Sequence, residues 1–182
     1  MRILLLTQYY APEQVGAAIW IRQLAAALVS RGHAVTVLTA FPNYPDGRVG
    51  EGYRGRWFQT EWIEGVRVVR SYIYATVKRG FWPRAWSFGS FCASALGRGL
   101  ALRGGFDAVY AILPPLTLGV TAAGIARAKG ARLVTNVQDL YPYIAVATGY
   151  LRNRTAIRFF EAMERWIYRR SERIVVISEG FR

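Results

Sequence analysis

The chain is short of cysteine, histidine and acidic residues, and each shortage excludes a class of site. One cysteine, Cys92, allows no disulfide within the chain and no zinc site built from cysteines. One histidine, His33, follows the glycine expected to end a helix, which favours a structural role over catalysis. Only 11 acidic residues accompany 24 lysines and arginines, and the net charge of +13 implies an anionic partner: nucleic acid, an anionic membrane or a phosphorylated substrate.

Long apolar runs are also missing. The longest, residues 85–102, is broken by Arg98 and is rich in glycine and serine, which argues against a membrane-spanning helix. The opening run is too short for a secretory signal and lacks a cleavage site. Hydrophobic residues make up 53% of the chain, which is ample for a core. We therefore expect a cytoplasmic protein that touches a membrane surface.

Strand-like and helix-like segments alternate along the chain. Apolar and β-branched runs predict strands at residues 3–6, 34–39, 66–74, 106–113, 131–137 and 173–177. Helical spacing predicts helices at residues 17–31, 86–103, 116–129 and 155–170. This alternation implies βαβ units, so we predict a Rossmann-like, doubly wound α/β domain with a parallel sheet. Residues 42–62 carry turn residues and are predicted to form a long functional or mobile loop.

The predicted domain spans residues 1–182, and the last predicted strand is followed by no closing helix. A domain rarely finishes in this way, so we expect that a second domain follows in a longer protein.

Candidate site residues follow from the expected sheet, because ligands bind beyond the carboxyl ends of parallel strands. The first such loop carries Glu13 and Gly16, and a ligand there could approach backbone N–H groups at a helix start. Glu13 either binds a substrate or satisfies N–H groups at the next helix, the second being slightly favoured. A single glycine is not a dinucleotide fingerprint, which disfavours NAD or FAD. Asn43 and Gln138 follow other strands.

Asp139 is the sharpest catalytic candidate. It comes just after a predicted buried strand, so its carboxylate is expected to face the cleft at the end of the sheet. There it could accept a hydrogen bond from a substrate hydroxyl or act as a base. Capping of the turn into residues 140–142 is an equally good interpretation.

A basic and aromatic stretch lies in the middle of the chain. No acidic residue occurs between Gly65 and Phe106, whereas cations are frequent, at Arg67, Arg70, Lys78, Arg79, Arg84, Arg98 and Arg103. Cations beside aromatic rings suit contact with an anionic membrane, and the residues predicted to make it are Lys78, Arg79, Trp82, Arg84 and Trp86. A core helix with a solvated cationic edge is the next interpretation. Stacking on single-stranded nucleic acid comes last, so no nucleic-acid partner is predicted.

Five short motifs occur in order along the chain: YYAPE at 9–13 with Gly16, RGHAVTVLT at 31–39, FPNYPDG at 41–47, VQDLYP at 137–142 and IVVISEGFR at 174–182. Together they resemble the N-terminal domain of GT-B glycosyltransferases of family 4. The resemblance is strongest to bacterial enzymes of capsule, O-antigen and colanic-acid synthesis, including the fucosamine-transferase type. Tyr143 departs from the pattern, because the family commonly carries an acidic residue there.

The resemblance implies a retaining transfer of a sugar (hexosyltransferase type) without a bound metal or other cofactor. The missing second Rossmann domain would hold most of the nucleotide-sugar donor site. Residues 1–182 would bind the acceptor, often a sugar on a lipid-linked diphosphate, and would be inactive or weakly active alone. By matched position Gly16 would lie near the donor diphosphate, and Glu13 and Asp139 would face the acceptor. The stretch at 78–86 fits a membrane-docking region on the inner face of the plasma membrane.

A second hypothesis needs no reaction. The chain could be a stand-alone basic Rossmann module that binds nucleotides or nucleic acid without catalysis. The gene distinguishes the two hypotheses, because only the glycosyltransferase hypothesis predicts that a domain with two spaced glutamates follows.

Overall fold

The computed structural model describes residues 1–78 and 80–181 and confirms the α/β class. The strands are β1 (Arg2–Leu6), β2 (Ala34–Ala40), β3 (Phe58–Ile63), β4 (Val66–Ser71), β5 (Ala108–Leu113), β6 (Arg132–Val137) and β7 (Arg173–Val176). The α-helices are α1 (Gly16–Ser30), α2 (Phe81–Ala101), α3 (Leu116–Lys129), α4 (Tyr143–Ala147) and α5 (Arg154–Tyr168). Two 3-10 turns complete the fold, η1 (Glu51–Tyr53) and η2 (Glu179–Phe181).

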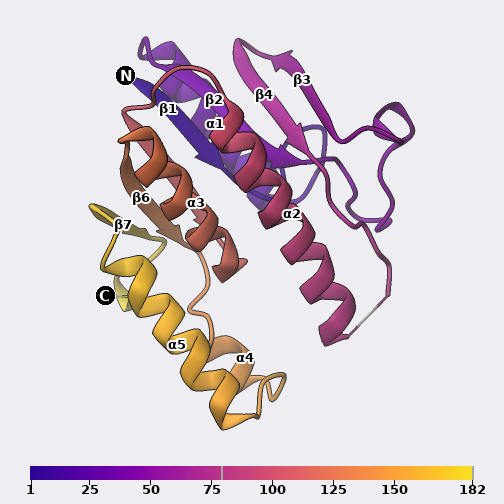
Figure 1. Ribbon diagram of the computed structural model, residues 1–182, viewed down its shortest axis with the longest axis vertical. Helices are drawn as coiled ribbons and strands as arrows, with labels where there is room; N and C mark the ends of the chain where they lie inside the picture. The colour runs from indigo at the N-terminus through magenta and orange to yellow at the C-terminus, as the bar shows by residue number, and fades with distance from the viewer. Residues whose placement is uncertain (79, 182) are drawn as a thin grey trace.

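The strands form one seven-stranded sheet in the order β3-β4-β2-β1-β5-β6-β7 (Figure 1). Every pairing is parallel except that of β3, which runs antiparallel to β4 at the edge. The central strand β1 lies between β2 and β5, and the chain winds outward from it in both directions. The carboxyl ends of β1 and β5 are therefore the switch point, where this class of sheet binds its ligands.

Two apolar layers cover the sheet, one on each face. Leu5 and Val37 pack with Ile21 of α1 on one face. Leu4 and Leu6 belong to the larger cluster on the other face, which also contains side chains of α2, α3 and α5. Because side chains alternate across a strand, a strand covered on both faces needs an unbroken apolar run, as β1 has.

Residues 42–62 were predicted as a loop, and this prediction was wrong for the last five of them. Residues 58–63 form β3, which makes a hairpin with β4 through Glu64 and Gly65. These two residues have φ of 51° and 76°, the left-handed values that a two-residue hairpin turn of type I′ requires. Half-buried and exposed side chains alternate along β3, which is the pattern of an edge strand rather than a loop.

The helix predicted at residues 86–103 begins five residues earlier, so α2 includes the aromatic residues 82 and 86. Figure 1 shows the first turns of α2 extending past the sheet, on the side where α4 and α5 also lie. The short helix α4 was not predicted. Within the described part of the chain, no helix is both long and apolar enough to cross a bilayer.

Candidate functional site

Glu13 joins two loops at the carboxyl edge of the sheet. Its Oε1 accepts hydrogen bonds from the backbone N–H groups of Asn43 and Tyr44, both at 2.9 Å, and its Oε2 accepts one from Tyr10 N–H at 3.3 Å. Burial raises the pKa of this carboxyl, although the three N–H groups favour its charged form. Glu13 thus satisfies backbone N–H groups, but those of the loop after β2 and of its own loop rather than those of α1.

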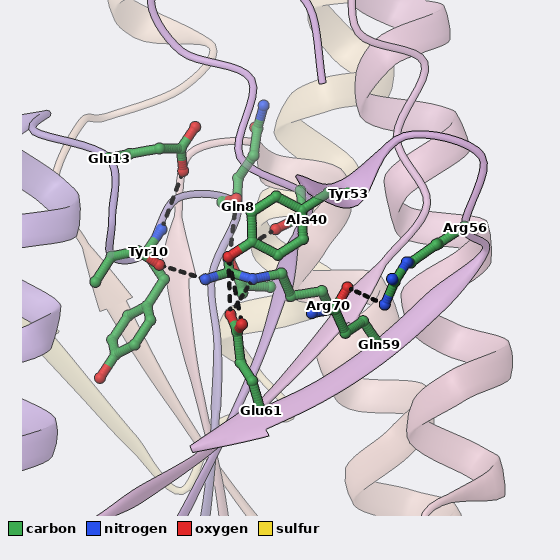
Figure 2. A network of polar contacts seen from close by, with 11 residues as sticks. Gln8, Tyr10, Glu13, Ala40, Tyr53, Arg56, Gln59, Glu61 and Arg70 are labelled. Atoms are coloured by element: carbon green, nitrogen blue, oxygen red, sulfur yellow. Dashed lines mark hydrogen bonds and ion pairs between the residues drawn. The ribbon is translucent and has the colours of Figure 1, made fainter. Parts of the chain in front are cut away.

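Arg70 is the centre of a polar network below these loops (Figure 2). Its side chain is fully buried on β4, where the sequence suggested part of a cationic surface. The guanidinium donates to Glu61 of β3 at 2.5 Å and to the carbonyls of Ala40, at 3.4 Å, and Ala11, at 2.5 Å. One side chain therefore connects β3, the end of β2 and the loop after β1.

Tyr53 covers this network from η1. The guanidinium carbon of Arg70 lies 5.0 Å from the centre of the Tyr53 ring, and the Tyr53 hydroxyl donates to Glu61 at 3.3 Å. The Tyr53 ring also lies 5.8 Å from that of Phe41, centre to centre. This network was not predicted, because Glu61 and Arg70 are brought together by a hairpin whose first strand was predicted as part of a loop.

Gly16 is exposed and is the first residue of α1. A Cβ added there would meet nothing within 4 Å, and the preceding residue, Val15, provides no side-chain cap. The first N–H groups of α1 are thus not capped by that side chain, and they point toward the carboxyl edge of the sheet. Such a helix start favours an anionic ligand.

Asn43 and Gln138 are both half-buried. The Asn43 side chain donates to the carbonyl of Phe41 at 2.9 Å, so its amide stabilises its own loop. The backbone N–H of Gln138 donates to the carbonyl of Leu113 at 3.1 Å and extends the pairing of β6 with β5. Asn43 and Glu13 are in direct contact, whereas Gln138 lies on the other side of the switch point.

Asp139 has an exposed side chain at the end of β6. None of the hydrogen bonds found among residues 1–78 and 80–181 involves its carboxylate, so the suggested turn cap is not formed there. The strands β1 and β6 are separated by β5 alone, and both end at the same edge. The loop after β1 leads to Gly16, and the loop after β6 carries Asp139. These two loops therefore start about 10 Å apart, measured across the strands, on the same edge of the sheet.

An apolar cavity of about 400 Å³ lies next to the end of β6. It is enclosed by the first half of α2, the start of α3, the α4 segment and α5, with lining residues that include Phe88, Pro115, Tyr141, Ile144, Ala145 and Phe160. The rings of Tyr141 and Phe160 meet edge to face at 5.3 Å. Burial raises the pKa of the Tyr141 hydroxyl, as expected for a phenol in apolar surroundings.

Of the five residues predicted to touch a membrane, four are described, and three of these lie in the first turns of α2, where Arg84 also lines this cavity. Lys78 is exposed just before α2, and Arg79 lies outside the described residues. Trp82 and Trp86 of α2 are 71% and 69% exposed, and Arg84 between them is exposed at the rim of the cavity. The Arg84 guanidinium carbon lies 5.8 Å from the centre of the Tyr150 ring. The first turns of α2 thus present two large rings and a cation to solvent.

Two further findings concern possible metal ligands and the thiol of Cys92. Among the described residues, no group of three or more histidine, cysteine or acidic side chains is placed to hold a metal ion. Cys92 is buried in the core cluster, and burial raises the pKa of its thiol.

Comparison of the sequence with known proteins shows the family of the chain, and comparison of the structure shows its fold. The family described as "Glycosyl transferase 4-like domain" matches residues 15–182. WcaI of Escherichia coli K12, named as a glycosyl transferase of colanic acid biosynthesis, is 31% identical over 141 residues, which are 76% of this chain. The match covers 34% of WcaI, so the chain spans about a third of that relative's length.

Two solved structures share the fold. Sucrose-phosphate synthase from Thermosynechococcus elongatus has a TM-score of 0.62 at 15% identity, over 97% of this chain and 42% of that one. The catalytic domain of starch synthase IV from Arabidopsis thaliana, bound to ADP and acarbose, has a TM-score of 0.53 at 15% identity, over 76% and 34% of the two chains. The chain therefore belongs to the glycosyl transferase 4-like family and has the Rossmann-like fold of GT-B glycosyltransferases.

Proposed function

We propose that residues 1–182 are the acceptor-binding half of a retaining hexosyltransferase that acts in surface polysaccharide synthesis. The donor is a nucleotide-sugar, held mainly by a second domain of the same longer protein, and the acceptor is a lipid-linked glycan. The observation that carries this proposal is the common edge at which the uncapped start of α1 and the exposed Asp139 both lie.

We assign a separate role in the reaction to each of three residues at this edge. The N–H groups of α1 at Gly16 bind the donor diphosphate, so that the leaving group is stabilised without a metal ion or other cofactor. The Asp139 carboxylate accepts a hydrogen bond from the acceptor hydroxyl and takes its proton as the glycosidic bond forms. Glu13 holds Asn43 and its loop in place, because both of its oxygens already accept backbone N–H groups.

Sugar transfer by the longer protein that contains the donor domain tests this assignment. Replacing Asp139 by Asn keeps the shape and removes the base, so we expect the rate to fall by about 10²-fold or more. Asp46→Asn is the matched control, because Asp46 is an exposed aspartate of the loop after β2. Turnover of Asp139→Asn equal to that of Asp46→Asn would exclude a central role for the Asp139 carboxylate.

We also propose that the chain docks on the anionic inner face of the plasma membrane from the cytoplasm. Lys78, Arg79 and Arg84 would attract anionic headgroups, and Trp82 and Trp86 would enter the boundary layer. The exposed rings of α2 and the cation between them support this contact.

Co-sedimentation with vesicles that contain phosphatidylglycerol tests the docking. Each cation near such a surface contributes about 1 kcal/mol, so removing three should weaken binding by about 100-fold. The control removes the same charge from the opposite edge of the sheet, with Arg31, Arg103 and Arg127 changed to alanine. Equal binding of the two triple variants would remove the docking proposal without affecting the assignment of Asp139.

A further inference from the structure

The apolar cavity beside β6 has a composition unlike that of a sugar site. Its walls are mainly apolar and include Ala85 and Phe88 of α2, Pro114 and Pro115 after β5, and side chains of the α4 segment. The hydroxyl-bearing side chains in the lining are those of Thr117, Tyr141, Thr148 and Tyr150. Hydroxyl groups of sugars would find few partners on such walls, whereas a hydrocarbon chain would find matching surface. A volume of about 400 Å³ is within the range of small-molecule sites.

The charge at the cavity is of one sign. Among the described residues that line it, Arg84 is the charged one and none is acidic. Arg84 is exposed at the rim, with its guanidinium facing the Tyr150 ring. An apolar interior with a cation at the rim fits a molecule that combines a hydrocarbon chain with an anionic head.

The surroundings of the cavity favour a lipid over a small soluble molecule. Next to the lining residues, large apolar side chains are exposed on α2, α4 and α5, namely those of Trp82, Trp86, Tyr143, Val146 and Phe159. A ligand whose chain leaves a bilayer at this surface would enter the cavity without crossing water. The cavity also adjoins the loop with Asp139, so a head group at Arg84 would lie on the same edge as the proposed base.

We propose that this cavity binds the hydrocarbon chain of a lipid diphosphate, next to its head group, and that Arg84 binds the diphosphate. The proposal rests on the proposed function, of which it specifies the acceptor: the chain of the carrier lipid lies in the protein rather than wholly in the bilayer. Specificity for the carrier then comes partly from the length of chain that the cavity can bury.

Gly89 allows a direct test. It lines the cavity on α2, has no positive φ, and a Cβ built there meets nothing within 4 Å. A leucine at this position would place its side chain in the space proposed for the ligand and would also favour the helix. Gly97, eight residues later on the same helix, is equally open to a Cβ and does not line the cavity, so Gly97→Leu is the matched control.

The measurement is calorimetric binding of four probes to the protein: inorganic diphosphate, geranyl diphosphate, farnesyl diphosphate and, as the probe without a diphosphate, farnesol. Burial of each methylene raises affinity about fourfold. Farnesyl diphosphate should therefore bind at least tenfold more tightly than geranyl diphosphate, and inorganic diphosphate should bind weakest. We expect Gly89→Leu to weaken farnesyl diphosphate binding at least tenfold and to leave inorganic diphosphate unchanged, while Gly97→Leu matches the unaltered chain. Arg84→Gln should weaken all three diphosphates and leave farnesol unaffected.

Two results would overturn the proposal. Equal affinity for all three diphosphates would assign the site to phosphate recognition alone. Unchanged farnesyl diphosphate binding in Gly89→Leu would mean that the hydrocarbon chain of the ligand binds outside this cavity.

Comparison with the sugar-transfer assay separates the two proposals. Transfer by the longer protein, with no prenyl diphosphate bound and with residues 143–148 protected from hydrogen exchange, would show that a segment of the protein fills the cavity. The proposed function would then stand while this inference fails. If prenyl diphosphates bind with the expected dependence on chain length but the longer protein transfers no sugar, this inference would stand and the proposed function would fail.

Discussion

The two sides of the switch point are built from different interactions. On the side of β2, β4 and β3, polar contacts tie the loops together: Glu13 accepts three backbone N–H groups, and Arg70 reaches Glu61 and two carbonyls. On the side of β6, aromatic and aliphatic side chains surround an open cavity. On the first side, the polar groups form their hydrogen bonds within the protein, whereas on the second side apolar surface is left uncovered.

This difference separates residues that hold the site from residues that meet a ligand. A buried charge is tolerated only when its hydrogen-bonding capacity is met within the protein, as it is for Arg70. Such a group fixes backbone positions and has little capacity left for a substrate. Exposed apolar side chains have the opposite property, because their burial still remains to be gained when a ligand binds.

The largest effect is expected for Arg70→Ala. This change removes the guanidinium that donates to Glu61 and to the carbonyls of Ala11 and Ala40, so the free energy of unfolding should fall by about 3 kcal/mol. Urea denaturation measures this change. Arg67→Ala, a half-buried arginine on the other face of the same strand, should cost less than about 0.5 kcal/mol. If the two variants were equally stable, the network would not be what distinguishes this side of the sheet.

Glu13→Ala should come next. Three backbone N–H groups lose their acceptor, and we expect a loss of about 2 kcal/mol in the free energy of unfolding. Hydrogen exchange should accelerate at the amides of Asn43 and Tyr44, which locates the effect. The neighbouring exposed residue Gln14, changed to alanine, should leave these amides protected. Unchanged exchange in Glu13→Ala would mean that the loops hold together without the carboxylate.

The open side should tolerate substitution better. Ile144 lines the cavity but is 45% exposed, so Ile144→Ala should lower the free energy of unfolding by less than about 1 kcal/mol. A loss as large as that of Glu13→Ala would show that the cavity lining contributes to the fold as much as the polar side does. Thermal unfolding of both variants in one buffer makes the comparison.

The smallest effect is a pH dependence that arises from Glu13. Its pKa is raised in the folded chain, mainly by burial, from a usual value of 4.5. Above pH 4.5 and below its raised pKa, the folded state therefore binds more protons than the unfolded state, and stability falls as pH increases through this window. Measured against Glu13→Gln, which cannot titrate, the unaltered chain should lose stability over this range. A gain with increasing pH would mean that the three N–H groups outweigh burial.

How far the sequence could predict the structure depends on the kind of element. The strands β1, β2, β5 and β6 were predicted nearly residue by residue, because strands covered on both faces are continuous apolar runs between turn residues. The edge strand β3 was missed, since its alternating side chains lie among turn residues and its partner is set by a hairpin. The early start of α2 was missed as well, because its first turns extend past the sheet and carry no buried stripe.

The candidate site divides in the same way. That Gly16 and Asp139 follow strands ending at one edge was predictable from the order of strands and helices. The partners of Glu13 were not, because Asn43 is thirty residues away and its backbone N–H has no signature in the sequence. Arg70 was assigned to a surface because composition records charge without recording burial.

The local order of apolar, polar and turn residues therefore determined by itself that this chain forms a doubly wound sheet with its ligand-binding loops at one edge. Short-range patterns suffice for this, since strand and helix periodicity and the handedness of βαβ crossovers leave few topologies. Only the tertiary structure decided that Arg70 is buried while Arg84 lies at the rim of an apolar cavity. Burial depends on neighbours contributed by β3, α4 and α5, and only the folded chain brings them together.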